Sequence, residues 1–292
     1  MKIVSVIIPA LNEREPLGEL LPRLREVLDR RRNKIAYEIV VVDDGSTDGT
    51  GEVAEENGAR VVRHAENLGN GAAVKSGMRA AKGDYLLLMD ADGQHDPEDL
   101  PRIIDGLETY HMVVGARTRG TGTGIHRGIA NWAYNKLASY VTGKKVLDLT
   151  SGLRGMHAKV ARRFIYLLPN TFSYPTTLTL AFIRTGHTVR YEPIEAKPRV
   201  GKSKIKLVRD GVRFFLIILR IATFFSPLRV FFPMSLLSAL LGLANYAYTF
   251  FTRHQFTTGS ALLLMLAVIL FTLSLISEQI AQLRFDRSED ER

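Results

Sequence analysis

Residues 86–100, LLLMDADGQHDPEDL, run from an apolar segment directly into a stretch with five acidic residues. The four apolar residues at the start predict a buried strand. Asp96 followed by Pro97 is typical of a helix N-cap with proline at the first helical position, and Glu98 and Asp99 suit the positive end of the helix dipole. We therefore assign these last three acids to the start of a helix.

The other polar residues of this stretch, Asp90, Asp92, Gln94 and His95, lie where the strand ends and are not needed for capping. Carboxylates crowded on a short turn repel one another. Hard oxygen ligands in such a turn can hold a divalent cation that also carries phosphate oxygens. A solvated acidic turn is the alternative, and the spacing alone does not separate the two.

Residues 1–116 alternate strand and helix signals. Short runs rich in Val, Ile and Leu predict strands, namely IVSVII, YEIVVV, ARVV, YLLLM and MVVGA. Segments between them, such as 16–31 and 71–82, have helical patterns. This order predicts an α/β fold with a mostly parallel sheet flanked by helices. Ligands bind beyond the carboxyl ends of such strands, where the clusters PALNE, DDGSTDGT and DADGQH follow the first, second and fourth runs.

Two segments have simpler local explanations. DDGSTDGT is a turn in which Ser46, Thr47 or Asp48 can cap the next helix, although Asp43 and Asp44 together are one acid more than a cap requires. NLGNGAAVKSG lacks the last glycine of G-x-G-x-x-G and follows the third strand, which argues against a Rossmann dinucleotide site. Its glycines and lysine at a helix start can still approach a phosphate.

The pattern changes after residue 117. A basic, glycine-rich loop, ARTRGTGTGIHRG, precedes a helix predicted over residues 129–141. The segment VLDLTSGLRGMHAKV follows, in which Asp148 interrupts an apolar run and Ser151, Gly152 and Arg154 form a turn. A buried capping aspartate is the alternative interpretation of Asp148. The seven histidines show no metal-ligand spacing, so we expect surface or packing roles for them.

Composition points to a membrane. The 292 residues contain no cysteine, which excludes disulfides and cysteine-bound metal, and the net charge is +9. Residues 230–252 and 255–277 carry no charge, and each run of 23 is long enough to cross a bilayer. Buried helices of a soluble core are the alternative. The short connection predicts a hairpin with both chain ends on one side.

Basic residues set the expected orientation. From residue 199 to residue 229 there are eight Lys or Arg residues and one acid, directly before the first span, which favours lipid over nucleic acid as the partner. The positive-inside rule places both ends in the cytoplasm. Within this run, Lys206, Asp210, Arg213 and Arg220 fall on one helical stripe, which predicts an interfacial amphipathic helix. We expect a catalytic domain over 1–200, this helix over 201–228, a hairpin over 229–283 and a tail over 284–292.

Together, SVIIPALNE, IVVVDDGSTDGT, NLGNGAAVKSG, LMDADGQHDPEDL and DLTSGLRGM resemble the inverting family-two glycosyltransferases of GT-A fold. The later KPRVGKSKIKLVRDGVRFF and the C-terminal hairpin resemble the polyprenyl-phosphate branch, which includes dolichyl-phosphate mannose synthases and undecaprenyl-phosphate glucosyltransferases. The resemblance covers essentially the whole chain. Two positions depart from it: Leu11 stands where relatives often carry Tyr, and Gly93 replaces a commoner Leu.

The resemblance implies a donor site for a nucleotide sugar. The residues that would bind the nucleoside and its diphosphate are Pro9, Ala10, Asn12, Glu13, Asp43 or Asp44, Gly69, Lys75, Asp90 and Ala91. Mg2+ or Mn2+ would be bound by Asp90, Asp92 and Gln94. The base and the sugar stay open, and GDP-mannose and UDP-glucose are both compatible with the motifs.

The resemblance also implies an acceptor site for a polyprenyl phosphate. The residues that would contact the lipid phosphate are Arg117, Arg127, Ser151, Arg199, Lys202 and Lys204. Asp148, Asp92 and Arg127 would be the catalytic residues. A homo-oligomer, a tetramer, is implied by the resemblance alone, and nucleic acid is not an expected partner.

The chemistry agrees with these roles. Breaking a sugar–diphosphate bond builds negative charge on the leaving group, which a metal ion and basic side chains can stabilise. A lipid phosphate is already ionised near neutral pH, so we expect Asp148 to position groups rather than to remove a proton. A single in-line displacement would invert the anomeric centre and give a β-linked product.

Two other functions are compatible with parts of the pattern. A processive polysaccharide synthase shares the catalytic fold but normally carries a Q-x-x-R-W motif, and the sole tryptophan, Trp132, follows Asn131 instead. A membrane protein that only senses nucleotide sugars is the second alternative. In a protein that only binds the nucleotide sugar, the metal site would be expected to decay. The presence of Asp90, Asp92 and Asp148 therefore favours an enzyme.

Overall fold

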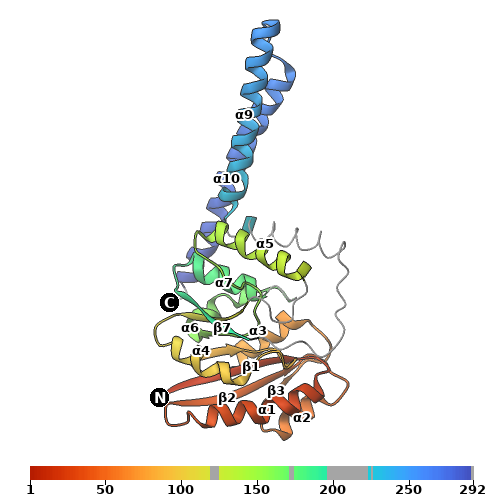
Figure 1. Cartoon of the computed structure of the whole chain (residues 1–292), viewed down its shortest axis with the longest axis vertical. Helices are drawn as coiled ribbons and strands as arrows, with labels where there is room; N and C mark the ends of the chain where they lie inside the picture. The colour runs from red at the N-terminus through yellow and green to blue at the C-terminus, as the bar shows by residue number, and fades with distance from the viewer. Residues whose placement is uncertain (119–124, 171–173, 196–222, 225, 291–292) are drawn as a thin grey trace. The chain divides into compact units, whose positions relative to one another are not determined.

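A computed structural model describes residues 1–118, 125–170, 174–195, 223–224 and 226–290, with the side chains of 125–131 and 284–290 left out (Figure 1). The chain divides into two compact units. The first comprises residues 1–139 and 144–204, and the second comprises residues 140–143 and 205–292. The predicted interfacial helix lies almost wholly in 196–222, outside the described residues.

Strands and helices alternate along the first unit (Figure 1). They are β1 (Lys2–Ala10), α1 (Arg14–Asp29), β2 (Ile35–Asp43), α2 (Thr50–Glu56), β3 (Arg60–Arg63), α3 (Asn70–Ala80), β4 (Tyr85–Leu88), η1 (Pro97–Asp99), α4 (Leu100–Gly106), β5 (Met112–Arg117), α5 (Ile125–Thr142), β6 (Arg154–His157), α6 (Ala158–Arg163), η2 (Ile165–Leu167), α7 (Tyr174–Arg184) and β7 (Val189–Ile194).

The strands form one seven-stranded sheet in the order β3-β2-β1-β4-β6-β5-β7. All pairings are parallel except those of β6, which runs antiparallel to both β4 and β5. Each of the five predicted apolar runs overlaps one of β1–β5, which confirms the α/β expectation. The reversed strand β6 was not predicted. It brings its first residue, Arg154, opposite Leu88 at the carboxyl end of β4.

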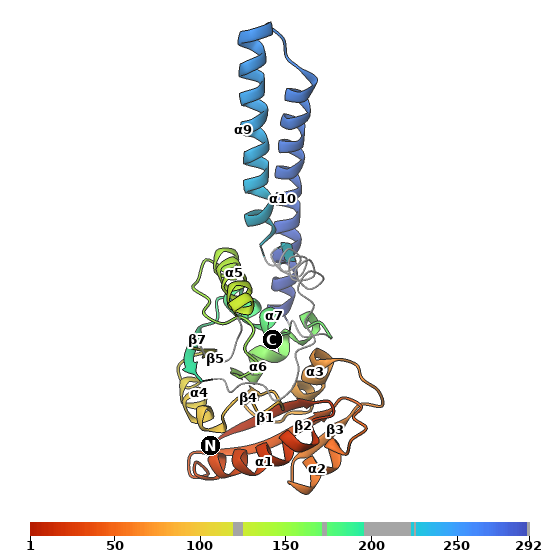
Figure 2. The ribbon, with the colours of Figure 1, turned by 45° about the vertical axis from the view of Figure 1, so that its right-hand side comes forward.

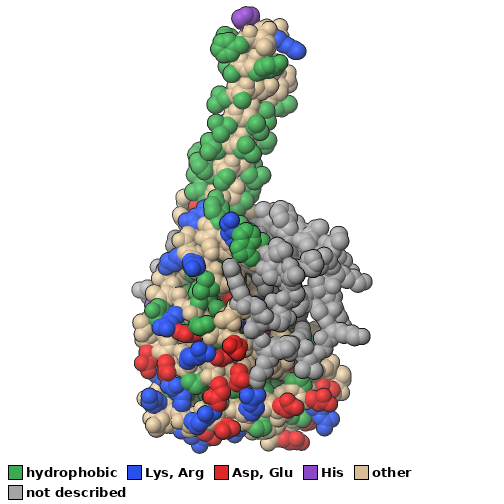
Figure 3. All heavy atoms as spheres, in the orientation of Figure 1, with side chains coloured by type: hydrophobic (Ala, Val, Ile, Leu, Met, Phe, Trp, Pro, Cys, Tyr) green, Lys and Arg blue, Asp and Glu red, His purple; other side chains and the backbone are tan. Residues whose placement is uncertain are grey.

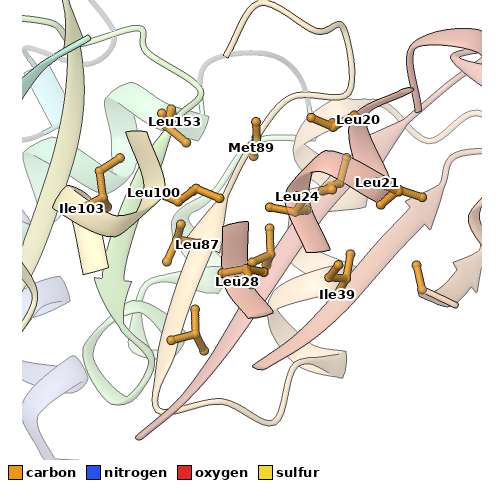
Figure 4. Close-up of a cluster of buried hydrophobic side chains, with 14 of the residues drawn as sticks. Leu20, Leu21, Leu24, Leu28, Ile39, Leu87, Met89, Leu100, Ile103 and Leu153 are labelled. Atoms are coloured by element: carbon orange, nitrogen blue, oxygen red, sulfur yellow. The ribbon is translucent and has the colours of Figure 1, made fainter. Parts of the chain in front are cut away.

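The core forms because the strands are apolar on both faces and the helices on one. In α1 the buried residues recur every three or four positions, so one stripe of the helix faces the sheet. Figure 4 shows this contact: the α1 leucines point toward side chains of β2 and β4, and residues of α4 lie beyond them. The labelled members of the cluster are Leu20, Leu21, Leu24, Leu28, Ile39, Leu87, Met89, Leu100, Ile103 and Leu153.

Two predicted helix starts can be compared with the structure. Asp96 is the N-cap of η1, and its carboxylate accepts a hydrogen bond from the Glu98 backbone N–H at 3.2 Å, as predicted. For α2 the prediction was slightly wrong, because the N-cap position is Gly49 in a left-handed conformation. Asp48 nevertheless accepts a hydrogen bond from the Thr50 backbone N–H at 3.0 Å. Left-handed backbone favours glycine, which explains the displacement of the cap by one residue.

The second unit contains two long helices, α9 (Pro227–Arg253) and α10 (Thr258–Asp290), which run side by side in Figures 1 and 2. Small residues face the partner helix: the Ser235 and Ser238 hydroxyls donate to the Ala267 and Leu263 carbonyls at 2.8 Å, and Gly242 packs on Leu264. Hydrophobic side chains cover the outside (Figure 3). Both helices are long and apolar enough to cross a membrane.

Gly77 tests how closely α3 packs on the sheet. A Cβ atom there would overlap the buried Ile7 side chain and lie 3.1 Å from Val42 Cγ2. We expect Gly77→Ala to destabilise the protein by about 1–3 kcal/mol despite the better helix propensity of alanine. A melting curve of the full chain in detergent should show a fall of several degrees, roughly 2–4 °C per kcal/mol.

Gly18→Ala in α1 is the matched control. Its Cβ would meet only Val53 Cγ1 at 3.6 Å, an ordinary contact. The melting temperature of this variant should stay the same or rise slightly, since alanine is favoured over glycine in helices by up to about 1 kcal/mol. Equal melting temperatures for Gly77→Ala and the wild type would contradict the close approach of α3 to β1 and β2.

Candidate active site

Five segments meet at the carboxyl edge of the sheet. β1, β2 and β4 are parallel to one another. β5 runs in the same direction, because it and β4 are both antiparallel to β6, which lies between them. The segments after these four strands therefore lie at the same edge. The turn 148–152 joins them because β6, being reversed, starts at this edge. Open α/β sheets bind their ligands at this edge. The fold therefore brings together most of the residues assigned from sequence.

The first two segments hold each other through hydrogen bonds. Asn12, with a positive φ of 55°, accepts a hydrogen bond from the Thr47 backbone N–H at 3.0 Å and donates its own N–H to the Ser46 hydroxyl at 3.0 Å. The Glu13 N–H donates to Thr50 Oγ1 at 3.0 Å. Ala10 is paired with Asp43 in the sheet, and Pro9 is the residue before it. Asn12 and Glu13 are thus interlocked with the turn after β2, whereas Pro9 and Ala10 are buried.

The paired acids after β2 have different local roles. Asp43 Oδ1 accepts a hydrogen bond from the Ser46 N–H at 2.9 Å, which closes the turn. Asp44 is buried and reaches the segment before α3, where its carboxylate accepts hydrogen bonds from the Leu68 and Gly69 N–H groups at 3.0 and 2.9 Å. The sequence left open which acid would contact a nucleoside, and the structure assigns Asp44 a second role in holding a loop.

The start of α3 contacts the segment 168–170 of the same chain. Gly69, with φ of 100°, lies against the Asn170 carbonyl, which accepts hydrogen bonds from the Gly71 and Ala72 N–H groups at 3.0 and 3.3 Å. Lys75 Nζ donates to the Leu168 carbonyl at 3.3 Å and to the Asn170 side chain. Burial, and then Arg79, lower the pKa of Lys75. Gly69 and Lys75 therefore contact the 168–170 segment, and their phosphate contacts remain a prediction.

The acids of residues 90–99 fall into two groups by their contacts. The three capping acids each form an ion pair with an arginine: Asp96 with Arg23 at 3.2 Å, Glu98 with Arg30 and Asp99 with Arg102. Asp90 instead lies against the turn before β6, where a Cβ atom on Gly152 would overlap its carboxylate. Asp92 accepts a hydrogen bond from the Gln94 N–H at 3.2 Å, and Ala91 is buried between the two acids.

This turn fits a divalent cation that is also bound by a ligand. Asp90, Asp92 and Gln94 can supply hard oxygen donors, and a Cβ atom at position 152 would displace the Asp90 carboxylate from its present place. Among the described residues, no group of three or more His, Asp and Glu side chains is arranged to hold a metal by itself. Magnesium is usually bound by one or two carboxylates together with substrate phosphates, so an incomplete protein cage suits this chemistry.

Asp148 forms a two-point ion pair with Arg117. Arg117 Nε and a terminal nitrogen donate to the two carboxylate oxygens at 2.8 and 2.9 Å, and the guanidinium also donates to Thr150 Oγ1 at 2.6 Å. Burial opposes the charge of Asp148, but its hydrogen bonds with Arg117, the arginine charge and backbone N–H groups hold its pKa below the ordinary 3.8. Burial likewise opposes the charge of Arg117, while Asp148 and then Asp90 raise its pKa.

Arg154 is a site residue whose role the sequence did not indicate. It is fully buried, and it donates to the Pro175 carbonyl at 2.6 Å, to Thr179 Oγ1 at 3.0 Å and to the Ser151 carbonyl at 3.2 Å. Burial lowers its pKa. Arg154 thus supports the turn that carries Gly152. Ser151 is fully buried, and its hydroxyl has no partner within the described structure, so its contact with an acceptor phosphate remains a prediction.

Two of the histidines expected in surface or packing roles lie beside acids of this edge. His95 is buried under the acidic turn with Nε2 3.8 Å from Asp90 Oδ2, and His64 contacts Asp44. In the sequence, the position of His95 directly after Gln94 indicates that it lies near the acidic turn. No comparable sequence pattern marks His64. Arg199, Lys202 and Lys204 lie outside the described residues, as does the side chain of Arg127 in α5.

Comparisons with known proteins give a family and a fold. The profile described as Glycosyl transferase family 2 matches residues 5–165, and the GtrB C-terminal hairpin profile matches residues 226–283. The undecaprenyl-phosphate 4-deoxy-4-formamido-L-arabinose transferase of Edwardsiella ictaluri is 31% identical over 250 residues, covering 84% of this chain and 75% of that protein. The protein of the same name from Klebsiella pneumoniae is 29% identical over 259 residues, covering 84% and 74%.

Among solved structures, glucosyl-3-phosphoglycerate synthase from Mycobacterium tuberculosis in complex with Mn2+ and UDP-glucose matches with a TM-score of 0.57 at 23% identity. The match covers 74% of this chain and 77% of that one. The same enzyme in complex with phosphoglyceric acid matches with a TM-score of 0.59 at 22% identity, covering 76% and 80%. This likeness confirms the predicted GT-A fold.

Gly152→Ala tests the contact between the two turns. The added methyl group would displace the Asp90 carboxylate, so we expect Mn2+ affinity, titrated by electron paramagnetic resonance, to fall by about 10- to 100-fold, as for other supporting residues of metal sites. Gly186→Ala is the control, since its Cβ meets open space and the positive φ of 80° there adds only backbone strain. The control should lose about 1–2 kcal/mol of stability without weakening Mn2+ binding. Unchanged Mn2+ affinity in Gly152→Ala would contradict this assignment of Asp90.

The Asp148 pair predicts a pH dependence of stability. Because its folded pKa is lowered, its stabilisation is fully present above the unfolded pKa of 3.8 and is lost as pH falls through the folded value. At pH 7, Asp148→Asn should cost up to about 3 kcal/mol, since it leaves a partly buried arginine unpaired. The difference between the melting temperatures of wild type and variant should stay constant from pH 6 to 8 and shrink below about pH 4. A difference that disappears between pH 6 and 8 would show that Asp148 titrates there.

Proposed function

The chain belongs to glycosyl transferase family 2, and we propose that it transfers a sugar from a nucleotide sugar to a polyprenyl phosphate, with inversion, at the cytoplasmic face of a membrane. The observation that carries this proposal is the meeting of Asp90 with the 148–152 turn, beside the Arg117–Asp148 pair. An acidic, cation-binding turn and a basic group then face one reaction centre. The relatives named as undecaprenyl-phosphate transferases, and the hairpin profile, support a polyprenyl phosphate as the acceptor.

The donor would bind across the first three segments of the site. The nucleoside would lie near Pro9, Ala10, Asn12 and Glu13 with Asp43 or Asp44, and the diphosphate would reach the acidic turn. When bound at Asp90, Asp92 and Gln94, Mg2+ or Mn2+ would stabilise the negative charge that builds on the departing diphosphate. The neighbour of the same fold that was solved in complex with Mn2+ and UDP-glucose supports this arrangement. GDP-mannose and UDP-glucose are both candidate donors.

The acceptor phosphate would approach from the other side of the acidic turn. Arg117 would attract it, and Asp148 would fix the orientation of the Arg117 guanidinium. Because the pKa of Asp148 is held low, its carboxylate is a poor base at neutral pH, and an ionised lipid phosphate needs none. Ser151, Arg127, Arg199, Lys202 and Lys204 are proposed to complete the acceptor site. A single displacement by phosphate oxygen would give the β-linked product from an α-linked donor.

The hairpin would anchor the enzyme in the cell membrane, where its lipid acceptor resides. Its spans carry exposed apolar side chains along their length (Figure 3). In the sequence, basic residues precede the first span. The positive-inside rule then gives a multi-pass protein with both termini and the catalytic unit in the cytoplasm. A homo-oligomer remains part of the proposal on family resemblance.

Transfer can be measured with the full chain in nanodiscs that contain undecaprenyl phosphate, using a panel of UDP- and GDP-sugars. We expect one donor to give a β-linked lipid-phosphate sugar, with activity lost in EDTA and restored by Mn2+ or Mg2+. Asp92→Asn should lower turnover by about 100-fold or more, because a charged metal ligand is replaced by a neutral one. Asp96→Asn, in the same turn but capping a helix, should keep most of its activity.

Other outcomes would refute the proposal. Full activity of Asp92→Asn in EDTA would exclude the metal site. A polymeric product would favour the processive synthase, and tight nucleotide-sugar binding without transfer or hydrolysis would favour the sensor.

A further inference from the structure

His64 connects two of the site segments through both of its ring nitrogens. Nδ1 lies 2.7 Å from Asp44 Oδ1 at the end of β2, and Nε2 lies 2.8 Å from Ser76 Oγ in α3. The side chains of His64 and Asp44 are 9% and 4% exposed, so these polar contacts are shielded from water. Buried hydrogen bonds of this kind fix geometry because breaking one leaves an unsatisfied group.

The residue that His64 contacts is itself the support of a loop. Asp44 Oδ1 also accepts a hydrogen bond from the Leu68 N–H, and Oδ2 accepts one from the Gly69 N–H. The His64 N–H donates to the Asp43 carbonyl at 2.9 Å. The segment 64–69 is therefore tied to the end of β2 at both of its ends, and its orientation follows that of the Asp44 carboxylate.

The chemistry of the two partners fixes the role of each ring nitrogen. An ionised carboxylate only accepts hydrogen bonds, so Nδ1 carries the proton that is donated to Asp44. In the neutral ring Nε2 is then an acceptor, and the Ser76 hydroxyl donates to it. The order Ser–His–Asp is also that of a nucleophile with its base. Ser76 lies within the 70–80 helix, however, where its own N–H is part of the helical ladder rather than an oxyanion donor.

We propose that His64 and Ser76 are positioning residues of the donor site: they orient Asp44, and through it the 66–69 loop, for binding of the nucleoside diphosphate. This inference rests on the proposed function, which places the nucleoside at Asp43 and Asp44. Gly45 shows how close the two segments are, because a Cβ there would lie 2.7 Å from the Glu66 backbone. A rotated Asp44 carboxylate would therefore disturb both segments of the donor surface.

The proposal predicts an effect on donor binding more than on the chemical step. Neither the acidic turn nor the Arg117–Asp148 pair includes His64, so a bound donor should react at a near-normal rate. A loss of uniform binding raises KM and leaves kcat unchanged. A residue needed only for folding would lower the melting temperature without this selective change in KM.

Two conservative variants separate the two hydrogen bonds. The amide nitrogen of asparagine can replace Nδ1, so His64→Asn keeps the donor to Asp44, whereas the amide of glutamine replaces Nε2, so His64→Gln keeps only the contact with Ser76. We expect His64→Gln to raise the Kd for MnUDP or MnGDP, and the donor KM, by about tenfold or more, which corresponds to a lost hydrogen bond to a charged group. His64→Asn should stay within about threefold of wild type, and Ser76→Ala should lie between the two.

His157→Asn is the matched control. His157 is a partly buried histidine whose Nε2 bonds the Leu107 carbonyl at 2.8 Å, and it pairs with Tyr85 at the opposite end of β4. It should lose stability without a change in nucleotide Kd. All variants are compared as full chains in nanodiscs, with melting temperature, nucleotide Kd by calorimetry, and kcat and KM for transfer.

The outcomes distinguish this inference from the proposed function. If the wild type binds neither MnUDP nor MnGDP and transfers no sugar, the proposed function fails. If the wild type binds and transfers, but His64→Gln and Ser76→Ala keep its Kd and KM, the positioning role is wrong. A fall in kcat at unchanged KM would also overturn it. Should His64→Gln fail to fold, Ser76→Ala, which removes a single hydroxyl from a half-buried position, decides the question.

Discussion

The antiparallel strand β6 is the constraint on which the site depends. In a wholly parallel sheet this strand would start at the far edge, and the residues before it would lie away from the ligand-binding edge. Because β6 runs the other way between β4 and β5, the turn 148–152 returns to the carboxyl edge and meets Asp90. A Cβ atom at position 152 would overlap the Asp90 carboxylate, so the contact favours glycine there. Arg154, which is buried at the start of β6, donates a hydrogen bond to the Ser151 carbonyl in this turn.

The charges at this edge are arranged before any substrate binds. Arg117 is fixed by both oxygens of Asp148, and Asp90 lies near enough to favour the charged form of Arg117. Groups of opposite sign held in a partly dehydrated site need little rearrangement when charge moves during a reaction. The capping acids differ, since each is paired with an arginine on the molecular surface. Acids close together in sequence therefore divide into structural and site residues according to their partners.

The sequence alone was sufficient for features that depend on local pattern. The five apolar runs predicted β1–β5, Asp96 was identified as a cap, and the leftover Asp90 and Asp92 indicated the acidic turn. It could not predict features that depend on which distant residues meet. Nothing local marks β6 as reversed, Arg154 as buried, or His64 as the partner of Asp44 twenty residues away. Asp148 illustrates the limit: its interruption of an apolar run was visible, but its partner Arg117 lies 31 positions earlier.

The same bonds that close the individual turns also link the donor side of the site to the acidic turn. Asp44 holds Gly69, and the start of α3 behind it donates to the Asn170 carbonyl. The next described helix, α7, supplies the Pro175 carbonyl and the Thr179 hydroxyl that bind Arg154. Arg154 in turn supports the residues that contact Asp90. Each link is a hydrogen bond or a close contact. Asp44, Arg154 and Thr179 are buried, so a displaced group at these positions has few other partners. The proposed nucleotide and cation sites would share this framework, so binding at one would not need a motion at the other.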